Sequence, residues 1–147
     1  MNVSNSCESG DERTRQDKKR LKTMNPSSES VQRLMELGFI AAANGHAKDA
    51  EVIFAGVQAV RPDSELPMIG NAFVAMSNGK LPDTIQTLQA AVQKNPESEL
   101  AQSFLGATLK IAGMNQAADQ ALQRVIDTGS DKAAVGLAEA MMEYQPA

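Results

Sequence analysis

Aromatic residues, cysteine and histidine are scarce in this chain of 147 residues. It contains no Trp, one Tyr and four Phe, and its single cysteine and single histidine are Cys7 and His46. One cysteine excludes an intramolecular disulfide and any metal site that needs two or more thiolates. All-β folds depend on aromatic and β-branched residues, whereas the Ala, Leu, Gln, Glu and Met that are plentiful here are helix formers. The composition therefore predicts an all-α protein.

Long hydrophobic runs are absent as well. No stretch of the sequence has the length and apolar character of a transmembrane helix, and the first 23 residues lack the apolar core of a signal peptide. We therefore expect a soluble, intracellular protein that does not insert into membranes.

Positive charge is scarce outside the N-terminus. Residues 1–24 hold six Lys or Arg and four Asp or Glu, whereas residues 25–147 hold eight and fourteen. An acidic body argues against a nucleic-acid partner, because phosphates require clustered basic residues. The basic run at 18–22 could contact an anionic surface, but such runs are typical of solvated tails. We predict a disordered, charged tail over 1–26 and a helical domain over 27–147.

No arrangement of residues typical of catalysis occurs in the sequence. His46 stands beside Gly45 in a predicted turn, with no Ser–His–Asp set around it. The glycines are spread through the chain rather than gathered in a phosphate-binding loop, and the carboxylates are scattered. We predict no catalytic residue, no metal site and no cofactor, and hence a protein that is not an enzyme.

The chain repeats itself with a period of 34 residues. Three small-residue columns, two apolar columns and one proline column align at this spacing: Gly45, Gly79 and Gly113; Gly38, Ala72 and Gly106; Ala50, Thr84 and Ala118; Phe54, Leu88 and Leu122; Val57, Ala91 and Val125; Pro62 and Pro96. Apolar residues within each repeat recur every three or four positions, as in amphipathic helices. We predict three helical hairpins over 31–64, 65–98 and 99–132, with prolines ending the second helices.

The 34-residue spacing of the glycines changes the interpretation of two Asn-Gly pairs. Asn44-Gly45 and Asn78-Gly79 would, taken alone, indicate β-hairpin turns. At a spacing of 34 residues they instead fall between two helices, where a left-handed glycine closes the first helix. The third repeat keeps Gly113 and has Ala112 in place of asparagine, so glycine is the residue that the turn needs.

These columns resemble the tetratricopeptide repeat (TPR), a helix–turn–helix unit of 34 residues. Leu34, Met68 and Gln102 stand where the motif has tryptophan, and Ser130 stands where the third proline would fall. The resemblance implies a tandem TPR-like array, and the closing stretch to residue 144 is predicted to be a helix that caps the third repeat.

In TPR arrays the first helices line a concave surface that binds partners, and the resemblance implies which positions face inward. Those we assign to a partner-binding groove are Met35, Phe39, Leu66, Ile69, Phe73, Met76, Leu100 and Ser103. An apolar stripe of this kind is typical of a binding surface for an amphipathic helix. The alternative is that a helix of the same chain, or of a second copy, fills the stripe.

The stripe also excludes one class of partner. TPR proteins that hold the acidic C-terminal tails of heat-shock chaperones use Lys, Arg and Asn as a carboxylate clamp. The matching positions here are Met35, Phe39, Gly70, Leu100 and Phe104. None of these side chains can bind a carboxylate by charge, so we do not expect recognition of an acidic peptide terminus.

Three repeats, an acidic body and an apolar groove together resemble the small TPR chaperones of type III secretion. The stretch from Ser130 to Tyr144 is similar to the C-terminal helix of the branch that binds needle subunits. The resemblance implies a chaperone of the bacterial cytoplasm that holds an amphipathic helix of a needle subunit and prevents premature polymerisation. A second small helical co-chaperone is implied as a further partner. A chaperone of translocator proteins and a general TPR scaffold remain alternatives, and association with a second copy is left open.

Overall fold

Helices build the whole body of the protein. The computed structural model describes residues 12–13, 15–16 and 25–145, and within them seven helices run between Ser28 and Glu143 without any strand. Their bounds are α2 (Ser28–Ala43), α3 (Ala47–Val60), α4 (Leu66–Ser77), α5 (Leu81–Lys94), α6 (Glu99–Ile111), α7 (Asn115–Thr128) and α8 (Lys132–Glu143). None of these helices is both long and apolar enough to cross a membrane. The prediction of an all-α fold is confirmed.

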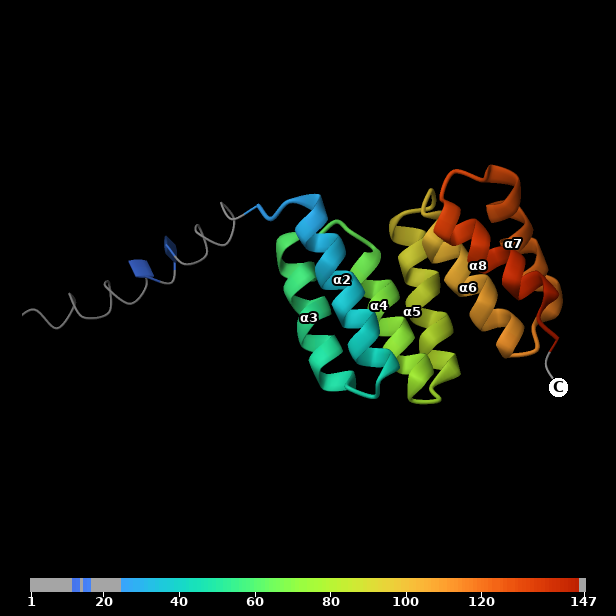
Figure 1. Ribbon diagram of the computed structural model, residues 1–147, viewed down its shortest axis with the longest axis horizontal. Coiled ribbons are helices and arrows are strands. Elements are labelled where there is room, and N and C mark those ends of the chain that lie inside the picture. Colours follow the sequence, from blue (N-terminus) through green and yellow to red (C-terminus); the bar gives the residue numbers. More distant parts are fainter. Residues whose placement is uncertain (1–11, 14, 17–24, 146–147) are drawn as a thin grey trace, which may run out of the picture.

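The helices form three hairpins that follow one another along the long axis of the molecule in chain order (Figure 1). Each first helix packs against its own second helix, and the next first helix packs against both. Thus α4 contacts α2 and α3, α6 contacts α4 and α5, and α8 contacts α6 and α7. This succession is the predicted array of three repeats with a capping helix.

Left-handed glycines close the first helix of every hairpin. Gly45, Gly79 and Gly113 have φ angles of 83°, 75° and 80°. The amide of each glycine donates to a carbonyl of the last helical turn, as Gly79 does to Met76 at 2.9 Å. Residues with a Cβ rarely adopt this conformation, which explains why the glycine recurs while the asparagine before it does not.

The repeat columns form the core. Phe54, Leu88 and Leu122 are each at most 1% exposed, and each lies at the centre of its own hairpin between the two helices and the next repeat. The column with Ala50 and Ala118 is buried too, and its larger member, Thr84, donates its hydroxyl to the Lys80 carbonyl at 2.8 Å. The internal hydrogen bond removes the cost of burying this hydroxyl.

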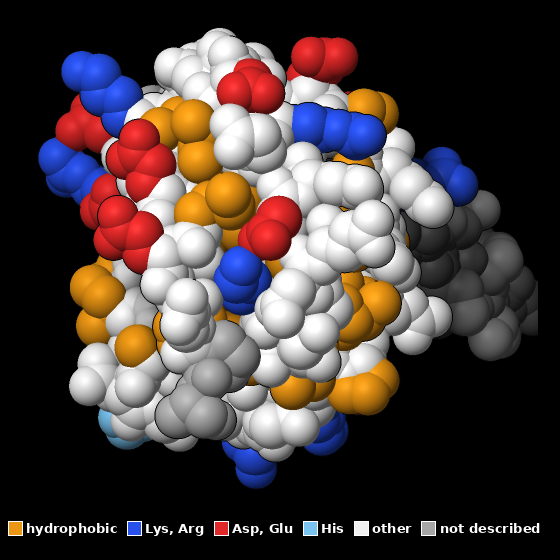
Figure 2. All heavy atoms as spheres, turned by 90° about the vertical axis from the view of Figure 1, so that its right-hand side faces the viewer, with side chains coloured by type: hydrophobic (Ala, Val, Ile, Leu, Met, Phe, Trp, Pro, Cys, Tyr) orange, Lys and Arg blue, Asp and Glu red, His pale blue; other side chains and the backbone are white. Residues whose placement is uncertain are grey.

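Proline follows the second helices of the first two repeats, as the pattern predicts, and a glycine ends that of the third. Pro62 and Pro96 directly follow the C-caps of α3 and α5, Arg61 and Asn95. The third repeat lacks this proline, and α7 ends instead at the left-handed Gly129, with φ of 66°. Beyond it α8 covers the last hairpin, and the α7–α8 end shows hydrophobic side chains only in small patches between charged and polar ones (Figure 2).

The predicted tail, residues 1–26, lies mostly outside the described residues, as does Cys7. Within it Glu12, Arg13, Arg15 and Gln16 are helical, and Asn25 and Pro26 lead into α2. Arg61 holds this junction, because its guanidinium donates to Asn25 Oδ1 and to the Pro26 carbonyl. Disorder elsewhere in the tail stays a prediction, and residues 146–147 of the predicted domain are likewise not described.

Candidate functional site

Phenylalanine rings close the middle of the surface formed by the first helices. The Phe39 ring on α2 lies 5.6 Å from that of Phe73 on α4 and 5.5 Å from that of Phe54 on α3, both edge to face. It also stacks on Phe104 of α6, with ring centroids 6.1 Å apart and ring planes 14° apart. Such pairs are favourable arrangements of the ring quadrupoles. The four rings (Phe39, Phe54, Phe73 and Phe104) are named the phenylalanine cluster below.

An open hollow lies at one end of this cluster. It has a volume of about 500 Å³, and its apolar lining consists of Val31, Met35, Phe39, Leu66 and Leu100. These five residues define what we call the apolar hollow. Its size lies within the range of about 300–1,000 Å³ that is common for ligand sites. Since one turn of a helix with its side chains fills a cylinder about 10 Å wide and 5.4 Å tall, the hollow has room for about one turn.

Three structural elements converge to make the hollow. Val31, Met35 and Phe39 lie four residues apart on one face of α2. Leu66 and Leu100 lie in the first turns of α4 and α6. These two helices begin on the same side of the array, so both leucines reach the hollow. The loop after α3 adds Arg61 and Ser64, and the loop before α8 adds Asp131.

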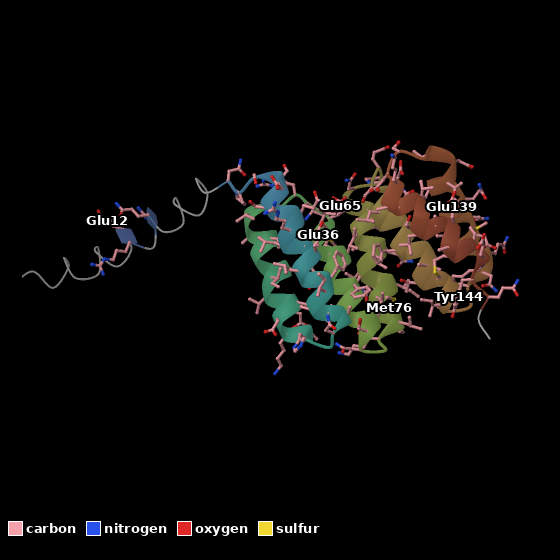
Figure 3. The ribbon with its side chains drawn as sticks, viewed as in Figure 1. Glu12, Glu36, Glu65, Met76, Glu139 and Tyr144 are labelled. Carbon is pink, nitrogen blue, oxygen red and sulfur yellow. The ribbon has the colours of Figure 1, made fainter. Side chains whose placement is uncertain are left out.

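The charged groups around the hollow are mostly acidic. A shallower adjoining hollow shares Leu66, Leu100 and Asp131 with it and adds Glu65, Glu97 and Glu99. Together with Glu36, this places five carboxylates around the two hollows, against the single guanidinium of Arg61. Glu36 and Glu65 are seen near each other beside α2 in Figure 3.

Four of the eight predicted groove residues line the apolar hollow: Met35, Phe39, Leu66 and Leu100. Two others lie farther along α4. Phe73 is half-buried in the phenylalanine cluster, and Met76 lies toward the other end of the helix from Glu65 (Figure 3). The predicted stripe is therefore divided, with the hollow at one end and the rings in the middle.

Ile69 and Ser103 do not face the groove, and the prediction for these two residues is wrong. Both side chains are 0% exposed. Both lie at the fifth position of their repeats, on the side that faces the next first helix, so Ile69 packs in the cluster that contains Ala101. Ser103 lies beneath α8 and donates its hydroxyl to the Ala134 carbonyl at 2.8 Å. Residues at this position hold consecutive repeats together.

Several residues of the hollow escape detection in the sequence. Val31 could have been found, because it precedes Met35 by one turn on the same helix face. Arg61, Ser64 and Asp131 could not, since they come from loops that approach the hollow only after the repeats have stacked. The sequence has no local signal for such an approach.

The lone histidine lies where the sequence places it. His46 precedes α3 in the first turn, with an exposed ring whose Nδ1 is 3.8 Å from the Asp49 carboxylate. Within residues 12–13, 15–16 and 25–145, no group of three or more His, Cys, Asp or Glu could hold a metal ion.

Comparison with solved structures confirms the TPR fold. The Sgt2 TPR domain from Aspergillus fumigatus is 18% identical and matches 86% of this chain and 91% of its own, with a TM-score of 0.60. The type III secretion chaperone SycD from Yersinia enterocolitica, solved with a peptide of the translocator YopD, is 15% identical over 79% of this chain and 95% of its own, at 0.56. A type III secretion complex from Aeromonas hydrophila is 14% identical. The match covers 79% of this chain and 78% of its own, with a TM-score of 0.58.

The search of curated proteins found no match. The family model described as "Bacterial type III secretion protein (HrpB1_HrpK)" matches residues 21–146, which is most of the chain and includes all seven helices. The chain therefore belongs to the HrpB1_HrpK family of bacterial type III secretion proteins.

Proposed function

We propose that this protein is a cytoplasmic type III secretion chaperone that holds an amphipathic helix of a needle subunit at the apolar hollow. The observation that carries the proposal is the hollow itself, an open site of about 500 Å³ with five apolar side chains around it. Monomeric proteins rarely leave such a site without a partner. A needle subunit polymerises through its own apolar helices, so covering one of them would keep it from assembling early.

The size of the hollow limits its contribution to the free energy of binding. One Leu or Phe side chain fully buried there would stabilise a complex by about 1.5–3 kcal/mol. A micromolar complex needs about 8 kcal/mol. The bound helix must therefore extend past the hollow, across the phenylalanine cluster toward Met76, with one apolar turn as its anchor.

A translocator is the second candidate cargo. SycD, a structural neighbour, was solved with a peptide of a translocator. The same hollow could receive one apolar turn of such a segment. The needle subunit and the translocator differ in size and in membrane activity, so they can be told apart by binding experiments with each purified protein.

A substitution that fills the hollow tests the proposal. Gln32 lines the hollow with an exposed side chain, so Gln32→Trp would occupy it without removing any core residue. Gln86→Trp, on an exposed position of α5 away from the hollow, is the matched control. Dissociation constants would be measured by titration calorimetry against the needle subunit and the translocator of the same secretion system.

We expect Gln32→Trp to weaken binding of the needle subunit about tenfold or more, with no change for the control. Sedimentation of the needle subunit should show less polymer in the presence of the unaltered protein than with Gln32→Trp. Equal binding by both variants would contradict the hollow as the site. Binding of the translocator alone would replace the needle subunit by the second candidate.

A further inference from the structure

Three carboxylates beside the apolar hollow have no cationic partner among the described residues. Glu36 lines the hollow from α2. Among the described residues, its side chain accepts one hydrogen bond, from the uncharged Gln32 amide, with Nε2 and Oε1 3.1 Å apart. Glu65 precedes α4 and makes no capping hydrogen bond with its side chain, while Glu97 is exposed in the loop before α6. Glu65 and Glu97 line the adjoining hollow. We name these three residues the acidic rim.

The neighbouring charged groups do not neutralise the rim. Arg61 donates to three uncharged acceptors, Asn25 Oδ1 and the carbonyls of Pro26 and Val60, and so holds the start of the domain. Asp131 and Glu99 accept hydrogen bonds from backbone amides instead. Asp131 accepts from the first amides of α8, and Glu99 accepts from the amides of Ser130 and Asp131. Hydrogen bonds to uncharged groups leave all of these charges in place, so five carboxylates surround the two hollows against one guanidinium and the net charge there is negative.

We infer that the segment bound at the apolar hollow is cationic, with Lys or Arg residues on both sides of one apolar turn. The inference rests on the proposed function, since it takes the hollow as the binding site. Carboxylates next to an apolar anchor attract a basic segment and repel an acidic one, which selects between partners of equal hydrophobicity. The net charge of −6 over residues 25–147 adds to this attraction at longer range.

The occupant is a segment of another protein rather than the chain's own basic run. Residues 13–22 contain six Lys or Arg, so they form a cationic segment of their own. Arg13 and Arg15, the basic residues of this run that the structure describes, do not line the hollow. We therefore take a segment of another protein as the occupant, and a variant of the basic run tests this choice below.

Two synthetic peptides test the inference on the full-length protein. They share one helix-forming sequence with a Leu and Phe anchor turn and differ only in carrying Lys or Glu at the flanking positions. Fluorescence anisotropy would measure their dissociation constants at low ionic strength and again at about 0.5 M salt, where surface charges are screened within a few ångströms. Gln32→Trp reports whether either peptide uses the hollow.

Two charge-matched triple variants complete the design. One neutralises the acidic rim and the other neutralises three exposed carboxylates of α3 and α8. The two sets are Glu36→Gln, Glu65→Gln and Glu97→Gln, against Glu51→Gln, Glu139→Gln and Glu143→Gln. Both raise the net charge by the same amount, so only the local position differs. Glu139 lies on α8, well away from Glu36 in Figure 3.

We expect the Lys peptide to bind about tenfold more tightly than the Glu peptide at low salt, with a much smaller difference at high salt. The rim variant should lose most of this preference and the control should keep it. Equal binding of both peptides, each weakened by Gln32→Trp, would overturn the charge inference and leave the proposed function intact. If neither peptide is affected by Gln32→Trp, the proposed function fails too.

Two further measurements test the other possible occupants of the hollow, which are the chain's own basic run and a second copy of the chain. In the variant Lys18→Gln, Lys19→Gln, Arg20→Gln and Lys22→Gln we expect unchanged affinity for the Lys peptide. A tenfold gain would show that the chain's own tail competes for the hollow and would overturn the inference. A fall in mass by light scattering when the Lys peptide is added would show that a second copy occupies the hollow, and would overturn it equally.

Discussion

Small side chains decide how closely two helices of a repeat approach each other. A Cβ added at Gly106 on α6 would lie 2.6 Å from Leu122 Cδ2, and one added at Gly38 on α2 would overlap the Phe54 ring. Leu122 and Phe54 are both 0% exposed, so an added Cβ would press on side chains enclosed in the core. At Gly136 on α8, by contrast, a Cβ would meet nothing within 4 Å.

Alanine should therefore have opposite effects at these glycines. We expect Gly106→Ala to lower the free energy of unfolding by about 1–3 kcal/mol, because it overpacks the helix contact. Gly136→Ala, on an exposed helical position, should raise it by about 0.5–1 kcal/mol. Urea unfolding followed by circular dichroism measures both. A loss at Gly136 as large as that at Gly106 would mean that close approach is not the reason for the small residue.

One buried cation depends on a single partner. Lys110 on α6 is 8% exposed, and its Nζ lies 2.6 Å from Asp119 Oδ1 on α7. Asp119 itself is 45% exposed in its side chain, so water screens the pair in part. The contact nevertheless ties the two helices of the third repeat together.

We expect Asp119→Ala to lower the free energy of unfolding by about 1–2 kcal/mol, because it leaves the Lys110 ammonium buried without a partner. Asp127→Ala, which removes an exposed carboxylate from the same helix, is the control and should change little. Adding Lys110→Met to Asp119→Ala should recover most of the loss in the same urea titration. Failure to recover would indicate that Asp119 acts on something other than Lys110.

At the scale of elements, α8 is held by two polar contacts from α6 as well as by its apolar face. Glu99 is 7% exposed and accepts from the amides of Ser130 and Asp131, at 3.1 and 2.8 Å. Ser103 donates to the Ala134 carbonyl one turn farther on. These contacts fix the loop and the first turn of the capping helix, so they also place Asp131 at the edge of the apolar hollow.

Removing the Glu99 carboxylate should loosen α8 selectively. In Glu99→Ala the partly buried amides of Ser130 and Asp131 lose their acceptor, so we expect faster hydrogen exchange across residues 130–143 and unchanged exchange in α2 and α3. Most contacts in a repeat array connect neighbours, so we expect the effect to be strongest at the α8 end. Glu97→Ala, at an exposed position of the same loop, is the control. Faster exchange throughout the chain would show that α8 supports the whole array.

At the scale of the whole molecule, the phenylalanine cluster joins the first repeat to the third. The stacked rings of Phe39 and Phe104 reach across α4, which lies between their helices. Such a contact adds about 0.5–1.5 kcal/mol beyond the burial of apolar area. Because it links elements that are not neighbours in the array, it limits how far the array can open.

Phe104→Leu should therefore let the array open. We expect a longer and broader distribution of distances between spin labels at Val52 and Gln123, exposed positions on α3 and α7. Double electron–electron resonance measures this distance distribution, with Cys7→Ser in place so that only the two chosen positions carry a label. Phe73→Leu, which removes a ring contact between adjacent repeats only, should change the distribution less. Equal effects of the two variants would contradict a special role for the Phe39–Phe104 pair.

Much of the fold can be predicted because its determinants are local. Gly45, Gly79 and Gly113 mark the turns, since each needs a left-handed conformation that other residues avoid. Phe54, Leu88 and Leu122 recur at one period, so their burial follows once the repeat is recognised. The candidate site is less predictable, because the same inward position can be open in one repeat and covered in the next.

The sequence by itself determined the helices, the turns and the order of the repeats, because period, glycine and apolar spacing act within a single hairpin. Only the tertiary structure decided which inward residues stay open. Packing of α8 on α6 covers Ser103, packing of α6 on α4 covers Ile69, and the stacking of Phe39 on Phe104 fills the middle of the stripe. The apolar hollow is what remains, since Leu66 and Leu100 come together with α2 only when all three repeats have stacked.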